Sequence, residues 1–358
     1  MKSWDAIIVG AGIIGVSLGI ALRKRGLRVL VVERGEPGRE ASYAAAGMLA
    51  DCAWETPPPL QPLATASARM YPEFVHELED ESGMRLDLRS EGSIVFPPSE
   101  HMHERPGFRA ADILPAPLAE MEPALAAREA PAVYLKERSI DPRALVTAAL
   151  KAARHRGVDT SSGDPVIAVD LADTRTVGVS TTKTSFLAPL VVNCAGAWAG
   201  QFRPGRVPTR PVKGQMLAVV MPRRDLLRHV VRSPEVYLVP RGDGRIVIGS
   251  TLEEAGYDKR TDPDTIHRLY RAALALVPEL SEARILEDWA GLRPATPDGL
   301  PILGATSTPG YYVATGHFRD GILLTPVTAR AMSQLICEGK TEYDLAPFSF
   351  MRFAKQAA

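Results

Sequence analysis

Apolar runs alternate with helical patterns at the start of the 358-residue chain. Residues 6–9 and 29–32 are apolar runs with the length of buried parallel strands. The segment between them has helical spacing and a basic end, and Gly26 is placed to end the helix. This pattern predicts a β–α–β unit. A strand over 311–314 followed by a helix over 325–338 predicts a return to α/β structure near the other end.

The middle of the chain mixes helical periodicity with strand-like alternation. Helical spacing predicts helices over 63–82 and 263–277, and Asp141-Pro142 marks the start of a third helix that ends at Gly157. Gly242-Asp243-Gly244 suits a hairpin turn. The predicted strands cover 91–97, 166–170, 176–180, 188–193, 215–220, 236–240 and 245–250. Residues 54–62 are rich in proline and are predicted to contain no helix, and residues 98–131 are predicted to form loops with a short helix.

The first β–α–β unit contains the glycine pattern of a dinucleotide site. Gly10, Gly12 and Gly15 form G-x-G-x-x-G between strand and helix. In this pattern the first glycine allows a sharp turn, the second a close approach to a pyrophosphate, and the third tight helix–strand packing. Glu33 ends the second strand, where an acid holds ribose hydroxyls. An acid there disfavours NADP but fits both NAD and the AMP half of FAD.

Two more predicted strands open through glycine-containing turns, at residues 194–198 and 316–322. Ligands of α/β sheets bind at the carboxyl ends of strands. Together with residues 10–15, these openings predict one sheet that gathers around one long ligand. Cys194 has no His or Asp near it in sequence, so we expect a packed residue and not a nucleophile.

Composition and charge narrow the class of protein. The chain is 46% hydrophobic and 23% charged, as in soluble globular proteins, and its 42 basic residues equal its 42 acidic ones. We therefore expect no nucleic-acid or membrane partner. With three distant cysteines and no signal-like segment, we expect a cytoplasmic protein without a metal site. His101 and His103 lack a supporting ligand, and the basic residues of 223–232 are predicted to be a solvated surface.

Six segments carry a resemblance along nearly the whole chain: GAGIIG (10–15), AAAGML (44–49), PVKG (211–214), YLVPR (237–241), AGLRPATPDG (290–299) and GHFRDGILL (316–324). Together they resemble the glycine oxidase and D-amino-acid oxidase family of FAD enzymes, most nearly the glycine oxidases of thiamine biosynthesis. The resemblance implies an α/β (α+β overall) fold. A Rossmann-like FAD-binding domain (1–50, 139–200 and 286–358) would be interleaved with a substrate domain on an antiparallel sheet (51–138 and 201–285).

The cofactor implied is FAD, held non-covalently because no cysteine adjoins GHFRDG. From the glycine turns and the resemblance together, the predicted FAD contacts are Gly10, Gly12, Ile13, Ile14, Gly15, Glu33, Arg34, Ala41, Ser42, Ala46, Gly47, Met48, Val166, Ala195, Gly196, Trp198, His317, Phe318, Arg319, Asp320, Gly321, Ile322 and Leu323.

The resemblance also implies substrate contacts at Arg293, Tyr237 and Arg319, the predicted catalytic residues. A guanidinium binds a carboxylate through two charge-assisted hydrogen bonds, so Arg293 is predicted to hold the substrate carboxylate. Tyr237 would orient the carboxylate or the amine, and Arg319 would contact substrate or flavin. The implied reaction is oxidative deamination of glycine, sarcosine or other small, D- or N-substituted amino acids. Hydride passes to flavin N5, and O2 is reduced to H2O2.

Two other interpretations stay open. A flavin-dependent D-amino-acid or 2-hydroxy-acid dehydrogenase that uses a quinone or another acceptor would share every FAD motif. A non-catalytic flavin-binding protein would not need Arg293 and Tyr237. Relatives suggest a homo-oligomer. Glu235 and Leu252 stand where the nearest relatives tend to have histidine and methionine, which motivates the hypothesis that the preferred substrate is no longer glycine.

Overall fold

The computed structural model describes residues 3–51, 56–97, 113–115, 118–126, 132–203 and 207–356. Within these ranges, none of the helices combines the length and apolar character that crossing a bilayer requires. The α-helices are α1 (Ile13–Lys24), α2 (Ala41–Ala44), α3 (Gln61–Ser82), α4 (Leu118–Met121), α5 (Pro142–His155), α6 (Pro263–Leu276) and α7 (Thr325–Glu338).

The first layer of the fold is a mostly parallel sheet, named here the central sheet. Its strand order is β19–β20–β13–β1–β2–β9. The β19–β20 pair is antiparallel and the other pairs are parallel. The strands are β1 (Ala6–Val9), β2 (Val29–Glu33), β9 (Asp159–Ser162), β13 (Leu190–Asn193), β19 (Ile302–Ala305) and β20 (Tyr311–Thr315).

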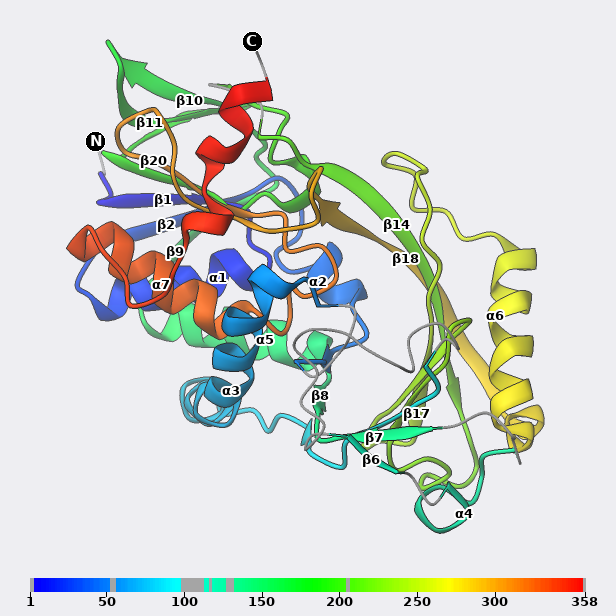
Figure 1. Ribbon diagram of the computed structural model, residues 1–358. Coiled ribbons are helices and arrows are strands. Elements are labelled where there is room, and N and C mark those ends of the chain that lie inside the picture. Colours follow the sequence, from blue (N-terminus) through cyan, green and yellow to red (C-terminus); the bar gives the residue numbers. More distant parts are fainter. Residues whose placement is uncertain are drawn as a thin grey trace.

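Both faces of the central sheet are covered, which explains its continuous apolar strands. Ile8 and Val31 pack into a core with α1, α3, α5 and α7 on one face. Ile7 and Val32 pack on the other face, against an outer sheet of β10 (Val166–Ala172), β11 (Arg175–Thr181) and β12 (Ser185–Leu187). Figure 1 shows the helices below the central sheet and the outer sheet above it. The carboxyl ends of the strands stay open between these layers.

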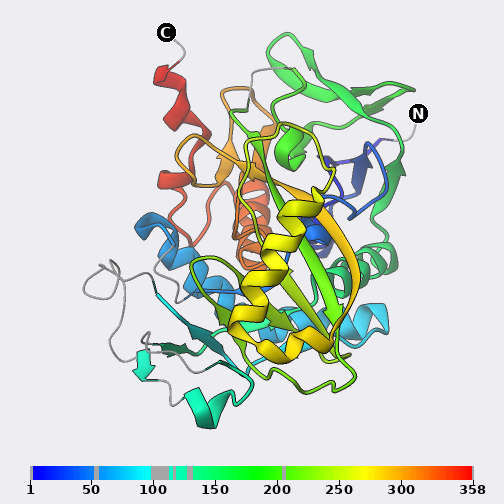
Figure 2. The same ribbon diagram turned by 90° about the vertical axis from the view of Figure 1, so that its right-hand side faces the viewer.

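A second, largely antiparallel sheet, named here the large sheet, lies beside this unit. Its order is β18–β14–β17–β16–β15–β5–β7–β6, with α6 packed on one face through Leu269 against Leu217 and Ile248. Figure 2 shows α6 lying across β14 and β18. The strands are β5 (Ser93–Val95), β6 (Ile113–Pro115), β7 (Val133–Leu135), β14 (Arg210–Val220), β15 (Val230–Arg232), β16 (Tyr237–Pro240), β17 (Arg245–Gly249) and β18 (Arg284–Ala295).

A short sheet joins the two units, in the order β3–β8–β4. Its strands are β3 (Met48–Leu49), β4 (Leu88–Arg89) and β8 (Arg138–Ile140). The predicted fold class, α/β with an additional antiparallel sheet, is confirmed. The domain boundaries stay a prediction, and the one between residues 285 and 286 falls inside β18.

One local prediction was wrong. Pro58–Leu60 form a 3-10 helix, and α3 begins directly after it at Gln61, although residues 54–62 were expected to contain no helix. Both helices have proline in their first positions, where the missing N–H has no intrahelical partner to lose.

Candidate active site

A cavity of about 480 Å³ lies between the open end of the central sheet and the large sheet. The turns after β1, β13 and β20 all line it, and these strands are neighbours in the central sheet. The three glycine-containing openings therefore meet at one cavity. Every predicted cofactor and catalytic residue lines this cavity except Gly15 and Leu323, which lie behind its surface. Their roles toward a bound ligand stay predictions.

The turn after β1 requires glycine for steric reasons. Gly10 has a φ of +107°, and a Cβ there would lie 2.5 Å from the carbonyl oxygen of Cys194. A Cβ on Gly15 would lie 2.1 Å from the carbonyl oxygen of Gly10. Gly15 thus allows α1 to pack against the turn, although it does not face the cavity. Leu323 is buried in the core shared with the helices.

The N-terminus of α1 opens onto the cavity beside two fixed oxygen groups. Glu33 accepts hydrogen bonds from Ala11 N (2.8 Å) and Gly35 N (3.0 Å), which hold its carboxylate at the cavity wall. Ser42 Oγ accepts from Ile13 N (3.0 Å). The N-cap residue of α1, Gly12, has no side chain to occupy the helix end. This arrangement fits a dinucleotide, with phosphate at the helix N-terminus and ribose hydroxyls on Glu33.

An aromatic and cationic stack lies at the part of the cavity wall near Glu33. The guanidinium carbon of Arg34 lies 3.6 Å from the ring centroid of Trp198. Tyr257 contacts the same indole at a centroid distance of 5.4 Å and donates its hydroxyl to Ala197 O (3.0 Å). Such flat surfaces suit a planar ring such as adenine.

The loop of Ala46, Gly47 and Met48 is held by an arginine that sequence reasoning did not single out. Arg241 is buried and donates hydrogen bonds to Ile140 O (3.0 Å) and to Ala46 O. Burial lowers the pKa of Arg241 to about 10, so it stays charged at neutral pH. A Cβ on Gly47 would lie 2.0 Å from Ile140 O. The available signal was the position of Arg241 as the last residue of the YLVPR segment.

The turn after β20 places a neutral histidine and a strained phenylalanine at the cavity. His317 Nε2 lies 3.1 Å from Thr328 Oγ1 on α7, and burial lowers the pKa of His317 to about 3. Its ring is therefore uncharged at neutral pH. Phe318 has a φ of +45°, an uncommon conformation for a residue other than glycine, and its N–H donates to Pro294 O (3.0 Å). This bond connects the turn to the end of β18.

Arg293 lines the cavity from β18. It donates to Ser250 Oγ (2.6 Å) and Thr251 O (3.1 Å), and burial lowers its pKa from the ordinary value. Tyr237 lines the same wall and donates its hydroxyl to Met216 Sδ (3.1 Å). The structure thus brings Arg293, Tyr237 and Arg319 to one cavity, and their contacts with a substrate stay predictions.

Two glycines that sequence reasoning missed make room for these side chains. A Cβ on Gly214 would lie 2.3 Å from an Nη atom of Arg293. A Cβ on Gly249 would lie 2.8 Å from the hydroxyl oxygen of Tyr237. Both glycines line the cavity. Gly214 closes the PVKG segment, which was the only sequence signal for this role.

Gly214→Ala should displace the Arg293 guanidinium while leaving the fold intact, because the clash falls on the end of a flexible side chain. We expect KM for a carboxylate-bearing substrate to rise roughly tenfold, as for a lost charge-assisted hydrogen bond. Steady-state kinetics on the flavin-loaded protein would show this. Gly19→Ala is the control, since its Cβ contacts would all be 3.5 Å or longer. A Gly214→Ala enzyme with unchanged KM would contradict the expectation.

The basic segment 223–232 is not simply a solvated surface, and that prediction was wrong for two of its residues. His229 is buried, and its Nδ1 lies 2.9 Å from a Glu122 carboxylate oxygen. Arg232 belongs to β15, donates to Glu137 Oε2 (2.8 Å) and lines the cavity. Each of these two side chains is paired with a buried acidic residue more than 90 residues away in sequence, so the local sequence gives no sign of the pairing.

Several other predicted positions can be placed. Glu235 lines the cavity, whereas Leu252 is 59% exposed and lies outside the lining. Cys194 is buried, and burial raises the pKa of its thiol. No cluster of three or more His, Cys, Asp and Glu side chains that could hold a metal occurs in the described ranges. His101 and His103 lie outside the described residues.

Comparison with known proteins agrees with this geometry. Residues 5–335 match the FAD dependent oxidoreductase family. The chain is 34% identical to the glycine oxidase of Geobacillus kaustophilus over 366 residues, which covers 98% of this chain and 97% of that protein. The crystal structure of glycine oxidase from the same organism matches with a TM-score of 0.91 and 33% identity, covering 98% of this chain and 99% of that one.

A second kind of relative is longer. The bifunctional protein ThiO/ThiG of Trichormus variabilis is 35% identical over 368 residues, covering 99% of this chain and 56% of that protein. The chain thus spans a little over half the length of the ThiO/ThiG relatives that it matches. The extent of the family match, together with the dinucleotide geometry of the cavity, shows that the chain belongs to the FAD-dependent oxidoreductases and that FAD is its cofactor.

Proposed function

We propose that this protein is an amino-acid oxidase that acts on glycine, sarcosine or other small, D- or N-substituted amino acids and passes electrons to O2, releasing H2O2. The observation that carries the proposal is the guanidinium of Arg293 at the cavity wall, fixed in direction by Ser250 and Thr251. The names of the glycine oxidase relatives support the choice of substrate class.

Some of the residues around the cavity are suited to hold the cofactor, and others are suited to bind the substrate. The N-terminus of α1, Glu33, Ser42 and the loop fixed by Arg241 would hold FAD. When bound, FAD supplies the two-electron oxidation of the amine. FAD attachment without a covalent bond stays a prediction.

Arg293 and Tyr237 are suited to bind and orient an amino acid. Two of the five N–H groups of a guanidinium hold Arg293 to its loop, so the direction of its planar fork is set before substrate arrives. A substrate carboxylate bound there would be placed by charge-assisted hydrogen bonds. The Tyr237 hydroxyl donates to a thioether, which is a weak acceptor, so it can turn toward a substrate oxygen or nitrogen at little cost.

Peroxide release by the purified yellow protein tests the proposal. The panel is glycine, sarcosine, N-ethylglycine, D-alanine and D-proline, with an oxygen-free sample as control. We expect the amount of peroxide released to rise in proportion to the amount of amine consumed. Bleaching of the flavin by these amines without oxygen, but no peroxide in air, would favour the dehydrogenase interpretation. Flavin that none of them reduces would favour a non-catalytic protein.

The order in which the enzyme prefers the amines of this panel tests the hypothesis about Glu235 and substrate preference. Glu235 lines the cavity, at a position where the resemblance implies histidine, and we propose that it shifts preference toward amines larger than glycine. Glycine and sarcosine ranked above every larger amine would show this hypothesis to be wrong. A role in thiamine biosynthesis, a cytoplasmic location and a homo-oligomeric state are further parts of the proposal.

A further inference from the structure

Strand β14 places polar side chains directly behind the candidate substrate site. Gly214 and Met216 line the cavity. Because side chains alternate along a strand, Lys213 and Gln215 project from the opposite face. Lys213 is only 5% exposed and Gln215 only 1% exposed. Side chains of these types are rarely so buried without polar partners.

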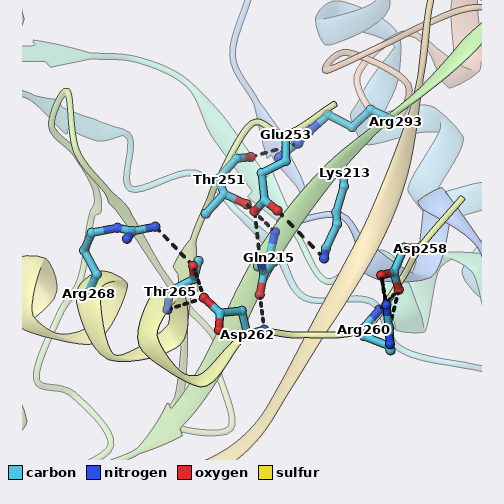
Figure 3. Close-up of polar contacts among 10 residues, drawn as sticks. All are labelled: Lys213, Gln215, Thr251, Glu253, Asp258, Arg260, Asp262, Thr265, Arg268 and Arg293. Atoms are coloured by element: carbon cyan, nitrogen blue, oxygen red, sulfur yellow. Dashed lines mark hydrogen bonds and ion pairs between the residues drawn. The ribbon is translucent and has the colours of Figure 1, made fainter. Parts of the chain in front are cut away.

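Their partners lie in residues 250–253, the segment that follows β17 (Figure 3). Lys213 and Glu253 exchange two backbone hydrogen bonds of 2.9 Å. Gln215 donates from its backbone N to Thr251 Oγ1 (2.8 Å) and from Nε2 to Glu253 Oε1 (2.8 Å). The Thr251 hydroxyl donates to the same carboxylate oxygen, and Lys213 Nζ lies 3.8 Å from the other.

The same segment also accepts hydrogen bonds from the Arg293 guanidinium. Ser250 Oγ and Thr251 O are the acceptors of the Arg293 guanidinium. Gln215 also accepts a hydrogen bond at Oε1 from the backbone N of Asp262 (2.7 Å), the N-cap of α6. The segment that orients Arg293 is therefore tied to β14 and, through Gln215, to the start of a helix.

We propose that Lys213, Gln215 and Glu253 form a clamp, named here the β14 clamp, that sets the position of the Arg293 guanidinium. They act as positioning residues, since Lys213, Gln215 and Glu253 do not line the cavity. Loosening the clamp moves Ser250 and Thr251, and with them the fork that receives the substrate carboxylate. The proposal rests on the carboxylate-binding role proposed above for Arg293.

Electrostatics alone makes a different prediction for Glu253. Its negative charge stabilises the charged form of Arg293, so it also weakens the attraction of this region for a second anion. If Glu253 acted only through charge, neutralising it would tighten carboxylate binding. If it acts by holding the segment, neutralising it would weaken carboxylate binding. The two roles therefore differ in sign.

Gln215→Met in the full-length, FAD-loaded protein is the first test, because it removes the side-chain hydrogen bonds with little change in volume or charge. We expect KM for the best amine of the panel to rise 5- to 20-fold, with kcat within twofold of wild type. The dissociation constant of acetate, followed through flavin absorbance, should rise by a similar factor. Unchanged KM and acetate binding in the flavin-loaded protein would overturn the clamp.

Glu253→Gln is the second variant, and it decides the question if Gln215→Met fails to fold. The clamp predicts weaker acetate binding, and tighter binding would overturn it. Glu254→Gln is the matched control, since Glu254 is an exposed neighbour that pairs with Arg210, and it should leave both constants unchanged. If wild type binds acetate but oxidises no amine, the proposed activity fails while acetate still tests the clamp. If wild type binds no acetate, both proposals fail.

Discussion

Arg293→Met should lower kcat/KM for amino-acid substrates by about 100-fold or more, mainly through KM, while FAD stays bound. The substrate carboxylate loses charge-assisted hydrogen bonds in a partly buried site, where removing one partner of a charged pair costs about 2–5 kcal/mol. A loss of about 3 kcal/mol corresponds to a change of about 100-fold. Steady-state kinetics and the flavin content of the purified protein are the measurements.

Two comparisons make the Arg293 result specific. Arg284→Met changes an exposed arginine at the start of the same strand and should leave kcat/KM unchanged. Arg293→Lys keeps the charge but loses the planar fork, so it should fall between wild type and Arg293→Met. An Arg293→Met enzyme that retains wild-type KM would place the carboxylate elsewhere, with Arg319 as the next candidate in the cavity.

Gly10→Ala should cost about 3 kcal/mol of unfolding free energy or more, and should weaken FAD binding at least tenfold. Part of the cost is the left-handed backbone, about 1–2 kcal/mol for a residue with a Cβ. The rest is the contact of 2.5 Å with the Cys194 carbonyl, which belongs to the backbone of β13's turn and cannot move aside cheaply. Thermal or denaturant unfolding and FAD titration would measure both effects.

Gly26→Ala separates these two causes. Gly26 also has a positive φ, +88°, but a Cβ there would meet nothing within 4 Å. It should lose about 1 kcal/mol of stability for its backbone conformation and should bind FAD as tightly as wild type. Equal losses in Gly10→Ala and Gly26→Ala would mean that the contact with Cys194 is relieved without cost.

Much of the cofactor region could be predicted because its signals are local. The glycine turn, the helix after it and the acid at Glu33 lie within residues 10–33, and the structure has β1, α1 and β2 where the pattern placed them. Each of the three strand ends can also be recognised from its local sequence, because an apolar run is followed by glycine. Their meeting at one cavity then follows from the general rule for α/β sheets.

The supports behind the site could not be predicted in the same way, because they depend on distant pairings. The local sequence around Arg232 predicts a surface cation, whereas in the fold Arg232 is paired with Glu137. Arg241 gave no sign that it would hold the carbonyl of Ala46, far away in the sequence. Lys213 and Gln215 follow the alternation of an ordinary strand, and only the position of residues 250–253 shows what they hold.

The strand order of the central sheet has a consequence for biosynthesis. β1 ends at Val9, but its neighbour β13 begins only at Leu190, and β20, the next strand beyond β13, begins at Tyr311. Contacts between such distant segments form slowly, because a long loop must close before they are gained. The backbone groups of β1 that pair with β13 therefore stay unpaired until residues 190–193 have been translated. Nascent chains are exposed to aggregation during that interval, when chaperones have most to protect.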